Sequence, residues 1–194
     1  MGSSYQSILA VGELANVRSA VAASGQQAVI IPVADGRWAV LPERENDIYA
    51  ETEDLAELLS LAEGSLAVSF NVFDSIVMTA RLFRGGECHH EYLSDQTFLT
   101  EVWDDDDNEM WFDMLGREYP PGATPSPGAY GADPGAFAAL GVAPVDEEAL
   151  GAVLNHPRLR AEERHHDMLD ALNLGCCSAL SMRYQDAVAS GLGV

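Results

Sequence analysis

Lysine is absent from this 194-residue chain: its ten basic residues are all arginine, against 31 aspartates and glutamates. The formal net charge is −21. Because nucleic acids and anionic membranes bind basic surfaces, we expect neither as a partner. A Walker A loop is excluded because it requires a lysine. The charge permits a basic protein partner, but solubility alone also explains an acidic surface and is the favoured explanation of the charge.

Cysteine is scarce, and the three present are Cys88, Cys176 and Cys177. An odd number with two neighbours does not resemble the disulfide framework of a small secreted protein. The first residues lack the basic and apolar regions of a signal peptide. No apolar run approaches the roughly 18 residues of a membrane-spanning helix. We therefore expect a cytoplasmic protein.

Long apolar segments are also missing. Instead, short apolar runs are separated by turn residues. These runs predict strands at residues 7–11, 28–34, 37–42, 66–73, 75–83 and 87–93. Hairpin turns are expected at Asp35-Gly36 and Gly85-Gly86. Helical spacing predicts helices at residues 13–24 and from Thr52 to about Gly64. The first strand can pair in parallel with the second through a right-handed crossover.

The second half of the chain has a different composition. Five of the nine prolines lie between Pro120 and Pro134, which predicts a long irregular connection. Beyond it, Asp146 is expected to cap a helix that reaches Leu154, and two more helices are expected at residues 161–172 and 178–190.

These elements predict an α+β fold. We expect a mostly antiparallel sheet with two helices on one face, followed by a long Pro/Gly-rich loop and a C-terminal helical segment. The expected division is a sheet core at residues 1–115, a connection at 116–135 and a helical segment at 136–194. Three short helices bury little alone, so we expect this segment to pack on the same core as a single domain.

The run WDDDDNE invites a calcium hypothesis. An EF-hand loop that starts at Asp104 needs glycine at its sixth position and glutamate at its twelfth. The chain has Glu109 and Leu115 there, so the motif fails and a solvated turn is favoured. The flanking aromatics either pin a loop to the body or anchor a partner. The candidate interaction surface is Trp103, Asp104, Asp105, Asp106, Asp107, Glu109 and Trp111.

The segment ECHHE places a cysteine beside two histidines. On a regular strand Cys88 and His90 share one face and His89 points to the other. One strand then offers at most two ligands, whereas structural zinc takes four, so we expect no metal and no cofactor. A cysteine nucleophile, Cys88 with His90 or Cys176 with His165, has no local signature in its favour. His165 also fits a half-buried position on an apolar helical stripe.

The chain has F-D-S before an apolar run, then a glycine turn and E-Y-x-S-D, and it ends in a helical tail. These features together resemble a group of bacterial proteins, chiefly from GC-rich bacteria, that has no assigned activity. The resemblance extends over about Ile8–Ala189 and implies a shared fold, but it implies no functional residue. Many members continue F-D-S with aspartate, where this chain has Ile76. The matching segments are Val72–Asp95, Gly131–Val142, Ala161–Leu174 and Met182–Tyr184.

Two hypotheses of function follow. The first is an acidic interaction module that regulates or neutralises a basic protein partner. The alternative is an enzyme or small-ligand binder, with a pocket where the strand meander meets the C-terminal helices. The absence of G-x-S-x-G and G-x-G-x-x-G motifs gives the enzyme no direct support. The candidate pocket residues are Asp74, Arg81, His90 and His165.

Overall fold

A computed structural model describes residues 2–43, 52–142, 144–175 and 178–194. The strands in these ranges are β1 (Tyr5–Val11), β2 (Ala28–Ala34), β3 (Arg37–Pro42), β4 (Leu66–Phe73), β5 (Val77–Arg84), β6 (Glu87–Leu93), β7 (Leu99–Trp103), β8 (Glu109–Asp113) and β9 (Glu118–Tyr119). The helices are α1 (Leu14–Ser24), α2 (Thr52–Leu59), α3 (Pro134–Ala138), α4 (Glu147–Leu154), α5 (Ala161–Ala171), the 3-10 helix η1 (Ser178–Ser181) and α6 (Tyr184–Ser190).

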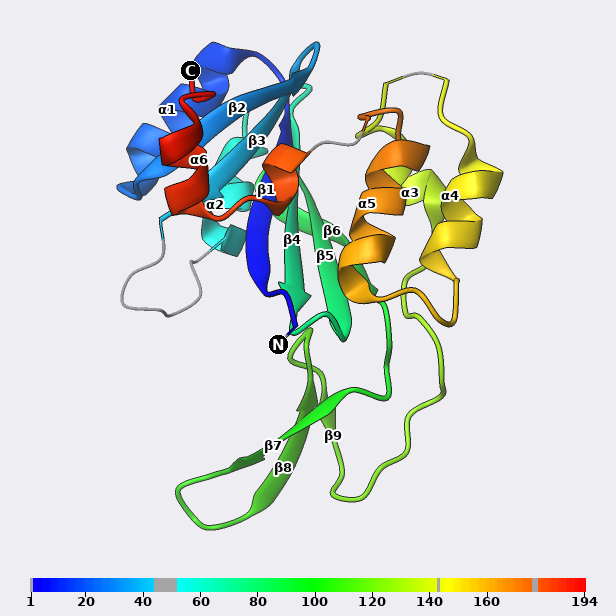
Figure 1. Ribbon diagram of the computed structural model, residues 1–194. Coiled ribbons are helices and arrows are strands. Elements are labelled where there is room, and N and C mark those ends of the chain that lie inside the picture. Colours follow the sequence, from blue (N-terminus) through cyan, green and yellow to red (C-terminus); the bar gives the residue numbers. More distant parts are fainter. Residues whose placement is uncertain (1, 44–51, 143, 176–177) are drawn as a thin grey trace.

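The main sheet has six strands in the order β2-β3-β1-β4-β5-β6 (Figure 1). Every neighbouring pair is antiparallel, which confirms the predicted α+β class. The predicted parallel pairing of the first two strands is wrong, because β3 lies between them. The Asp35-Gly36 turn folds β3 back on β2, and the other edge of β3 pairs with β1, Ile8 opposite Val40.

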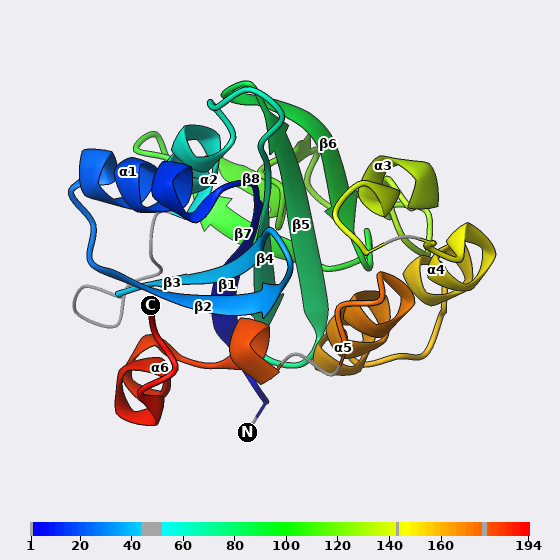
Figure 2. The same cartoon turned by 90° about the horizontal axis from the view of Figure 1, so that it is seen from above.

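The two faces of the main sheet are both buried. Successive side chains of a strand alternate between the faces, so Ile8 and Ala10 pack with Val17 of α1 and Leu55 of α2. As predicted, these two helices share one face. The C-terminal helices cover the opposite face, so the sheet is sandwiched between two helical layers (Figure 2).

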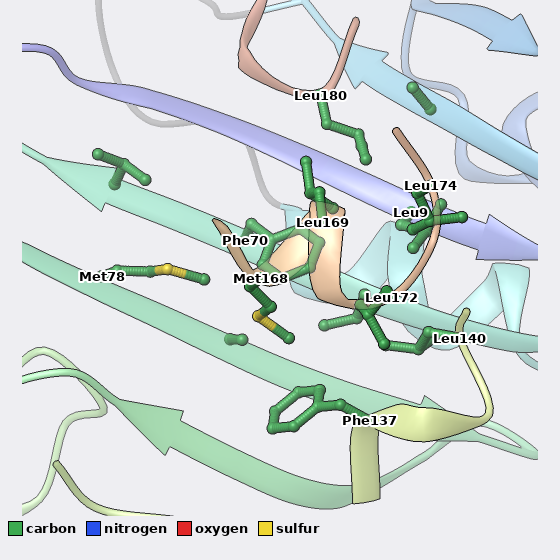
Figure 3. Packing of buried hydrophobic residues seen from close by; sticks show 14 of the residues in the cluster. Leu9, Phe70, Met78, Phe137, Leu140, Met168, Leu169, Leu172, Leu174 and Leu180 are labelled. Carbon is green, nitrogen blue, oxygen red and sulfur yellow. The ribbon is translucent and has the colours of Figure 1, made fainter. Parts of the chain in front are cut away.

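The larger of the two apolar clusters joins the sheet to the C-terminal helices. Figure 3 shows Leu9 and Phe70 from the strands facing Met168 and Leu169 of α5. Phe137 of α3, a helix that the sequence did not predict, closes the side of this cluster near β6. All five side chains are fully buried, so the helices of the second half complete the core that the sheet begins.

The C-terminal segment differs from the prediction in one respect. Instead of one helix over residues 178–190, the chain forms η1 and then α6. The break comes at Arg183, whose φ of −81° and ψ of 156° are those of an extended residue. The N-cap predicted at Asp146 is confirmed, since its side chain accepts a hydrogen bond from the Ala149 amide of α4.

A β-bulge changes the faces predicted for the ECHHE segment. Leu82 of β5 is opposite His90, but the next residue, Phe83, is opposite Cys88, so His89 is an extra residue in β6. Cross-strand partners share a face. Cys88 therefore lies on the α2 side with Phe83, and His90 lies on the C-terminal helix side with Leu82. The prediction that Cys88 and His90 share a face is wrong because of this bulge.

Part of the Pro/Gly-rich connection runs along the outer edge of β6. Tyr130 and Leu93 exchange backbone hydrogen bonds of 2.8 and 3.1 Å. The next residue, Gly131, has a φ of +64°, and a Cβ atom added there would lie 1.8 Å from the carbonyl oxygen of Glu91. Glycine is therefore required where the connection turns away from β6 into α3.

We predict that Gly131→Ala strongly destabilises the protein. The left-handed backbone and the steric overlap together should lower the free energy of unfolding by about 3 kcal/mol or more, measured by urea denaturation. Gly122→Ala is the matched control, because Gly122 has a φ of +75° but nothing within 4 Å of its added Cβ. The control should lose only about 1 kcal/mol. Equal losses in the two variants would show that the contact with Glu91 is unimportant.

Candidate functional site

Strands β7, β8 and β9 form a second sheet, which we call the arm (residues 99–119). It is antiparallel, in the order β7-β8-β9, and it projects away from the end of the main sheet (Figure 1). The sequence did not predict these strands, because aromatic and polar side chains occur on both faces of the arm and no clear alternation results. The arm contains the whole predicted interaction surface.

The acidic run is the turn between β7 and β8. The Asp107 amide donates to the Asp104 carbonyl and the Asp104 amide donates to the Asn108 carbonyl, each at 3.1 Å. The Asp104 carboxylate accepts hydrogen bonds from the amides of Asp106 and Asn108 and from the Asn108 side chain. The bonds from Asn108 and Asp106 lower the pKa of Asp104. The Asp104 carboxylate therefore orders the backbone of the turn, and the turn presents Asp105, Asp106 and Asp107 to solvent at the tip of the arm.

The aromatic residues beside this turn lie on one face of the arm. Cross-strand pairing places Trp103 opposite Glu109, and Trp111 opposite Glu101. Trp111 is half-buried and donates its indole N–H to the Glu109 carboxylate. Trp103 is 59% exposed. The structure thus brings the seven predicted surface residues together, and it leaves one large aromatic side chain open to solvent next to the acidic turn.

A buried carboxylate fixes the base of the arm. Asp113 accepts hydrogen bonds from the amides of Leu115 and Arg117 at 2.9 and 3.0 Å. It also accepts from Arg117 Nε at 2.6 Å and from the Tyr119 hydroxyl at 3.2 Å. A carboxylate with four donors holds the β8–β9 turn in a single conformation. This role could not be predicted from the sequence, because Asp113 is one of 31 acidic residues in the chain.

Two arginines connect the arm to the main sheet. The Arg117 guanidinium lies 3.8 Å from the ring centre of Tyr130, which is itself bonded to β6. Arg81 of β5 donates to the carbonyl of Leu115 and pairs with Glu91 at 2.9 Å and with Glu53 of α2. Arg81, a candidate pocket residue, therefore links β5 to β6, to α2 and to the arm.

The other three candidate pocket residues lie in separate places. Asp74 is in the turn after β4, where it accepts a hydrogen bond from the Gly2 amide at 3.0 Å. His90 Nε2 lies 2.7 Å from the Gly131 carbonyl oxygen. His165 lies inside the core, on the opposite face of the sheet from Arg81. The structure does not bring the four residues into one pocket.

A cavity of about 230 Å³ does lie between the meander and helices α4 and α5, but other residues line it, among them Ser94, Asp95 and His156. Its one buried cation is Arg164, which donates to the carbonyls of Val153 and Leu154 at 2.7 and 2.9 Å. These carbonyls end α4, so the guanidinium satisfies a helix C-terminus. The volume is below the roughly 300–1,000 Å³ of ordinary ligand sites.

The described residues contain no group of three or more histidine, cysteine and acidic side chains placed to hold a metal ion. Cys176 and Cys177, the other candidate cysteines, lie outside them. Within the described ranges, no helix is both long and apolar enough to cross a membrane. Comparison of the chain with protein-family models, curated proteins and solved structures gave no match. The resemblance to the bacterial group with the F-D-S pattern therefore stays a prediction.

His165 is more deeply buried than predicted. Its side chain is fully covered, its Nδ1 lies 2.8 Å from the Tyr5 hydroxyl, and its ring contacts Phe70 at 4.5 Å between centroids. Its Nε2 atom has no hydrogen-bond partner among the residues that the structure describes. Burial, with a smaller contribution from His166, lowers the pKa of His165 to about 3. The imidazole is thus a neutral part of the core.

We predict that His165 makes the fold sensitive to acid. Its folded pKa lies below its unfolded value, so its contribution is complete above about pH 6.5 and is lost as the pH falls toward 3. Between pH 7.5 and 5, wild type should lose about 2 kcal/mol more unfolding free energy than His165→Phe. Exposed His89 provides the control, since His89→Gln should keep the wild-type pH dependence. An unchanged pH dependence in His165→Phe would contradict this assignment.

We also predict how a glycine in the acidic turn affects the stability of the arm. Asp107 has a φ of +60°, a left-handed conformation that glycine adopts without strain. Asp107→Gly should stabilise the hairpin by about 0.5–1 kcal/mol, measured as slower hydrogen exchange of the Val102 amide. Asp106→Gly removes the same charge at a residue without positive φ and should speed this exchange. The same change in both variants would show that charge, and not backbone conformation, controls the turn.

Proposed function

We propose that this protein is an acidic, cytoplasmic interaction module that binds a basic protein partner through its arm, and thereby regulates or neutralises that partner. The observation that carries the proposal is the 59% exposure of Trp103 directly beside the carboxylates of Asp104–Asp107. Tryptophan contributes large contact area at low entropic cost and is frequent among the residues that dominate binding energy. Exposure of such a residue at a projecting tip favours recognition over a role in the core.

The charge of the arm indicates the chemistry of the partner. Between residues 99 and 119 the one basic residue is Arg117, and it is paired with Asp113. Within the described part of the chain, the carboxylates at the tip have no such paired cation, and Asp105, Asp106 and Asp107 are exposed. A basic partner would neutralise this charge and associate faster at low ionic strength.

The fixed base of the arm also supports binding. Because Asp113 and Arg81 hold the arm in place, a partner would not have to order a mobile loop. Less conformational entropy is then lost on association. A small-ligand or enzymatic function has weaker support, because the guanidinium in the cavity of about 230 Å³ is already bonded to the carbonyls that end α4.

We predict that a basic protein is captured from an extract of the native host at low salt and released at high salt. Capture should be lost in Trp103→Ala, and in a variant with Asp105, Asp106 and Asp107 changed to asparagine. Asp104 is left intact because its carboxylate orders the turn. Captured proteins are identified by mass spectrometry, and the affinity of the purified partner is then measured by calorimetry.

Two control variants test whether the arm is the surface involved. Leu61→Ala removes an apolar side chain that is 58% exposed outside the arm, and Glu147→Gln with Glu148→Gln removes charge from α4. Both should bind like wild type. A partner that binds equally well to the arm variants, or is lost equally from the control variants, would exclude the arm as the binding surface.

A further inference from the structure

The outer edge of β7 is a free strand edge. In the arm, β8 pairs with β7 on one side and with β9 on the other, so β7 has a partner on one side alone. No backbone hydrogen bond joins its outer edge to any residue in the part of the chain that the structure describes. A free edge of this kind can accept a strand from another chain.

The turn shows which backbone groups point outward. Asp104 donates to the carbonyl of Asn108, so this pair is hydrogen-bonded across the hairpin. Pairs in an antiparallel ladder alternate between bonded and non-bonded. The bonded pairs therefore include Val102 with Met110, and the non-bonded pairs include Trp103 with Glu109 and Glu101 with Trp111. The N–H and C=O groups of Glu101 and Trp103 point away from β8.

The β8–β9 pairing agrees with this assignment. The Asp113 amide donates to the carbonyl of Arg117, so it points toward β9 and away from β7. Trp111 lies two residues before Asp113 in β8 and pairs with Tyr119 of β9. The backbone N–H and C=O groups of Trp111 therefore also point toward β9. Its partner on β7, Glu101, must then direct its backbone groups to the outer edge.

The edges of the main sheet are less open. On β2, the Val194 amide donates to the carbonyl of Ile30 at 2.9 Å. On β6, Tyr130 occupies the edge at Leu93, and the bulge at His89 makes the strand irregular. Bulges and covering segments are ordinary protection against unwanted pairing. The regular strand β7 has neither of these features in the described structure.

The two faces beside the free edge differ in chemistry. Glu101 lies on the face of the arm that also carries Trp103 and Glu109. Val102 lies on the other face, with Met110 and Phe112 among the neighbours there, and it is 42% exposed. An added strand would alternate its side chains between these faces. On β7 itself, one face carries Leu99, Glu101 and Trp103 and the other carries Thr100 and Val102. A basic residue of the added strand would therefore lie beside Glu101, and an apolar residue beside Val102.

We infer that the partner supplies an extended segment with alternating basic and apolar residues, and that this segment adds to the arm as a strand at the edge of β7. This inference rests on the proposed function and specifies how the partner is recognised. Backbone hydrogen bonds to Glu101 and Trp103 give affinity. The alternation of arginine or lysine with apolar residues gives specificity, because a shift by one residue puts the cations on the apolar face.

The test uses a nine-residue peptide of alternating arginine and valine, capped at both ends, with the intact protein. A peptide of the same composition with its arginines and valines in separate blocks is the first control. Two further peptides carry N-methyl groups either on the valine amides or on the arginine amides. Binding is followed by NMR through the backbone amide signals of Glu101 and Trp103.

Strand addition predicts that one methylated peptide binds at least about tenfold more weakly and the other nearly normally, because alternate amides of an added strand point toward β7. The block peptide should also bind more weakly. Equal binding by the two methylated peptides would overturn strand addition and leave a purely electrostatic surface, with the proposed function intact. Capture of a native partner while no peptide binds would also overturn it. If no partner is captured from the extract and no peptide binds, the proposed function is excluded together with strand addition.

Discussion

The six-stranded sheet has apolar side chains on both faces, and each face must be covered for the protein to fold. Helices α1 and α2 cover the face that carries Ile8 and Phe83. The other face, with Phe70 at its centre, is covered only after the chain has passed β6 and the Pro/Gly-rich connection to reach α3–α6. The C-terminal helices are thus a necessary layer of the core. The arm lies on this path, between the last strand of the sheet and the helices.

The arm can project because its base is held by polar contacts. At the junction, Arg117 donates to Asp113 and Arg81 donates to the carbonyl of Leu115, and Tyr130 links the junction to β6. The two basic residues of this region are therefore occupied in holding the arm. Among the described residues, no arginine is paired with the carboxylates of the turn, and those of Asp105, Asp106 and Asp107 are exposed to solvent.

Much of the fold could be predicted from the sequence, because the first half of the chain follows simple periodicities. Apolar runs separated by Asp35-Gly36 and Gly85-Gly86 define β2–β6, and Gly25, with a φ of 71°, ends α1 as expected. The bulge at His89 could not be predicted, because one extra residue leaves no mark in composition. The break at Arg183 depends on its backbone conformation, which the apolar spacing of the segment does not specify.

The residues of the predicted interaction surface lie together in the structure, whereas the four predicted pocket residues do not. Trp103, Trp111 and the acidic run are close in sequence, so any turn between them brings them together. The pocket residues are distant in sequence, and whether they meet depends on which face of the sheet each one occupies. Arg81 faces α2, whereas His165 packs against the opposite face. Asp113 was missed because only the fold distinguishes a buried carboxylate from exposed ones.

Amide hydrogen exchange in the free protein, read by NMR along β7, tests most directly whether the arm is an ordered sheet with a free edge. An ordered hairpin with a free edge should show exchange rates that alternate along β7. Thr100 and Val102 amides, which are bonded to β8, should exchange slowly, and Glu101 and Trp103 amides should exchange fast. Uniformly fast exchange at all four residues would show that the arm is not a stable sheet. Slow exchange at Glu101 and Trp103 would show that the edge is already occupied.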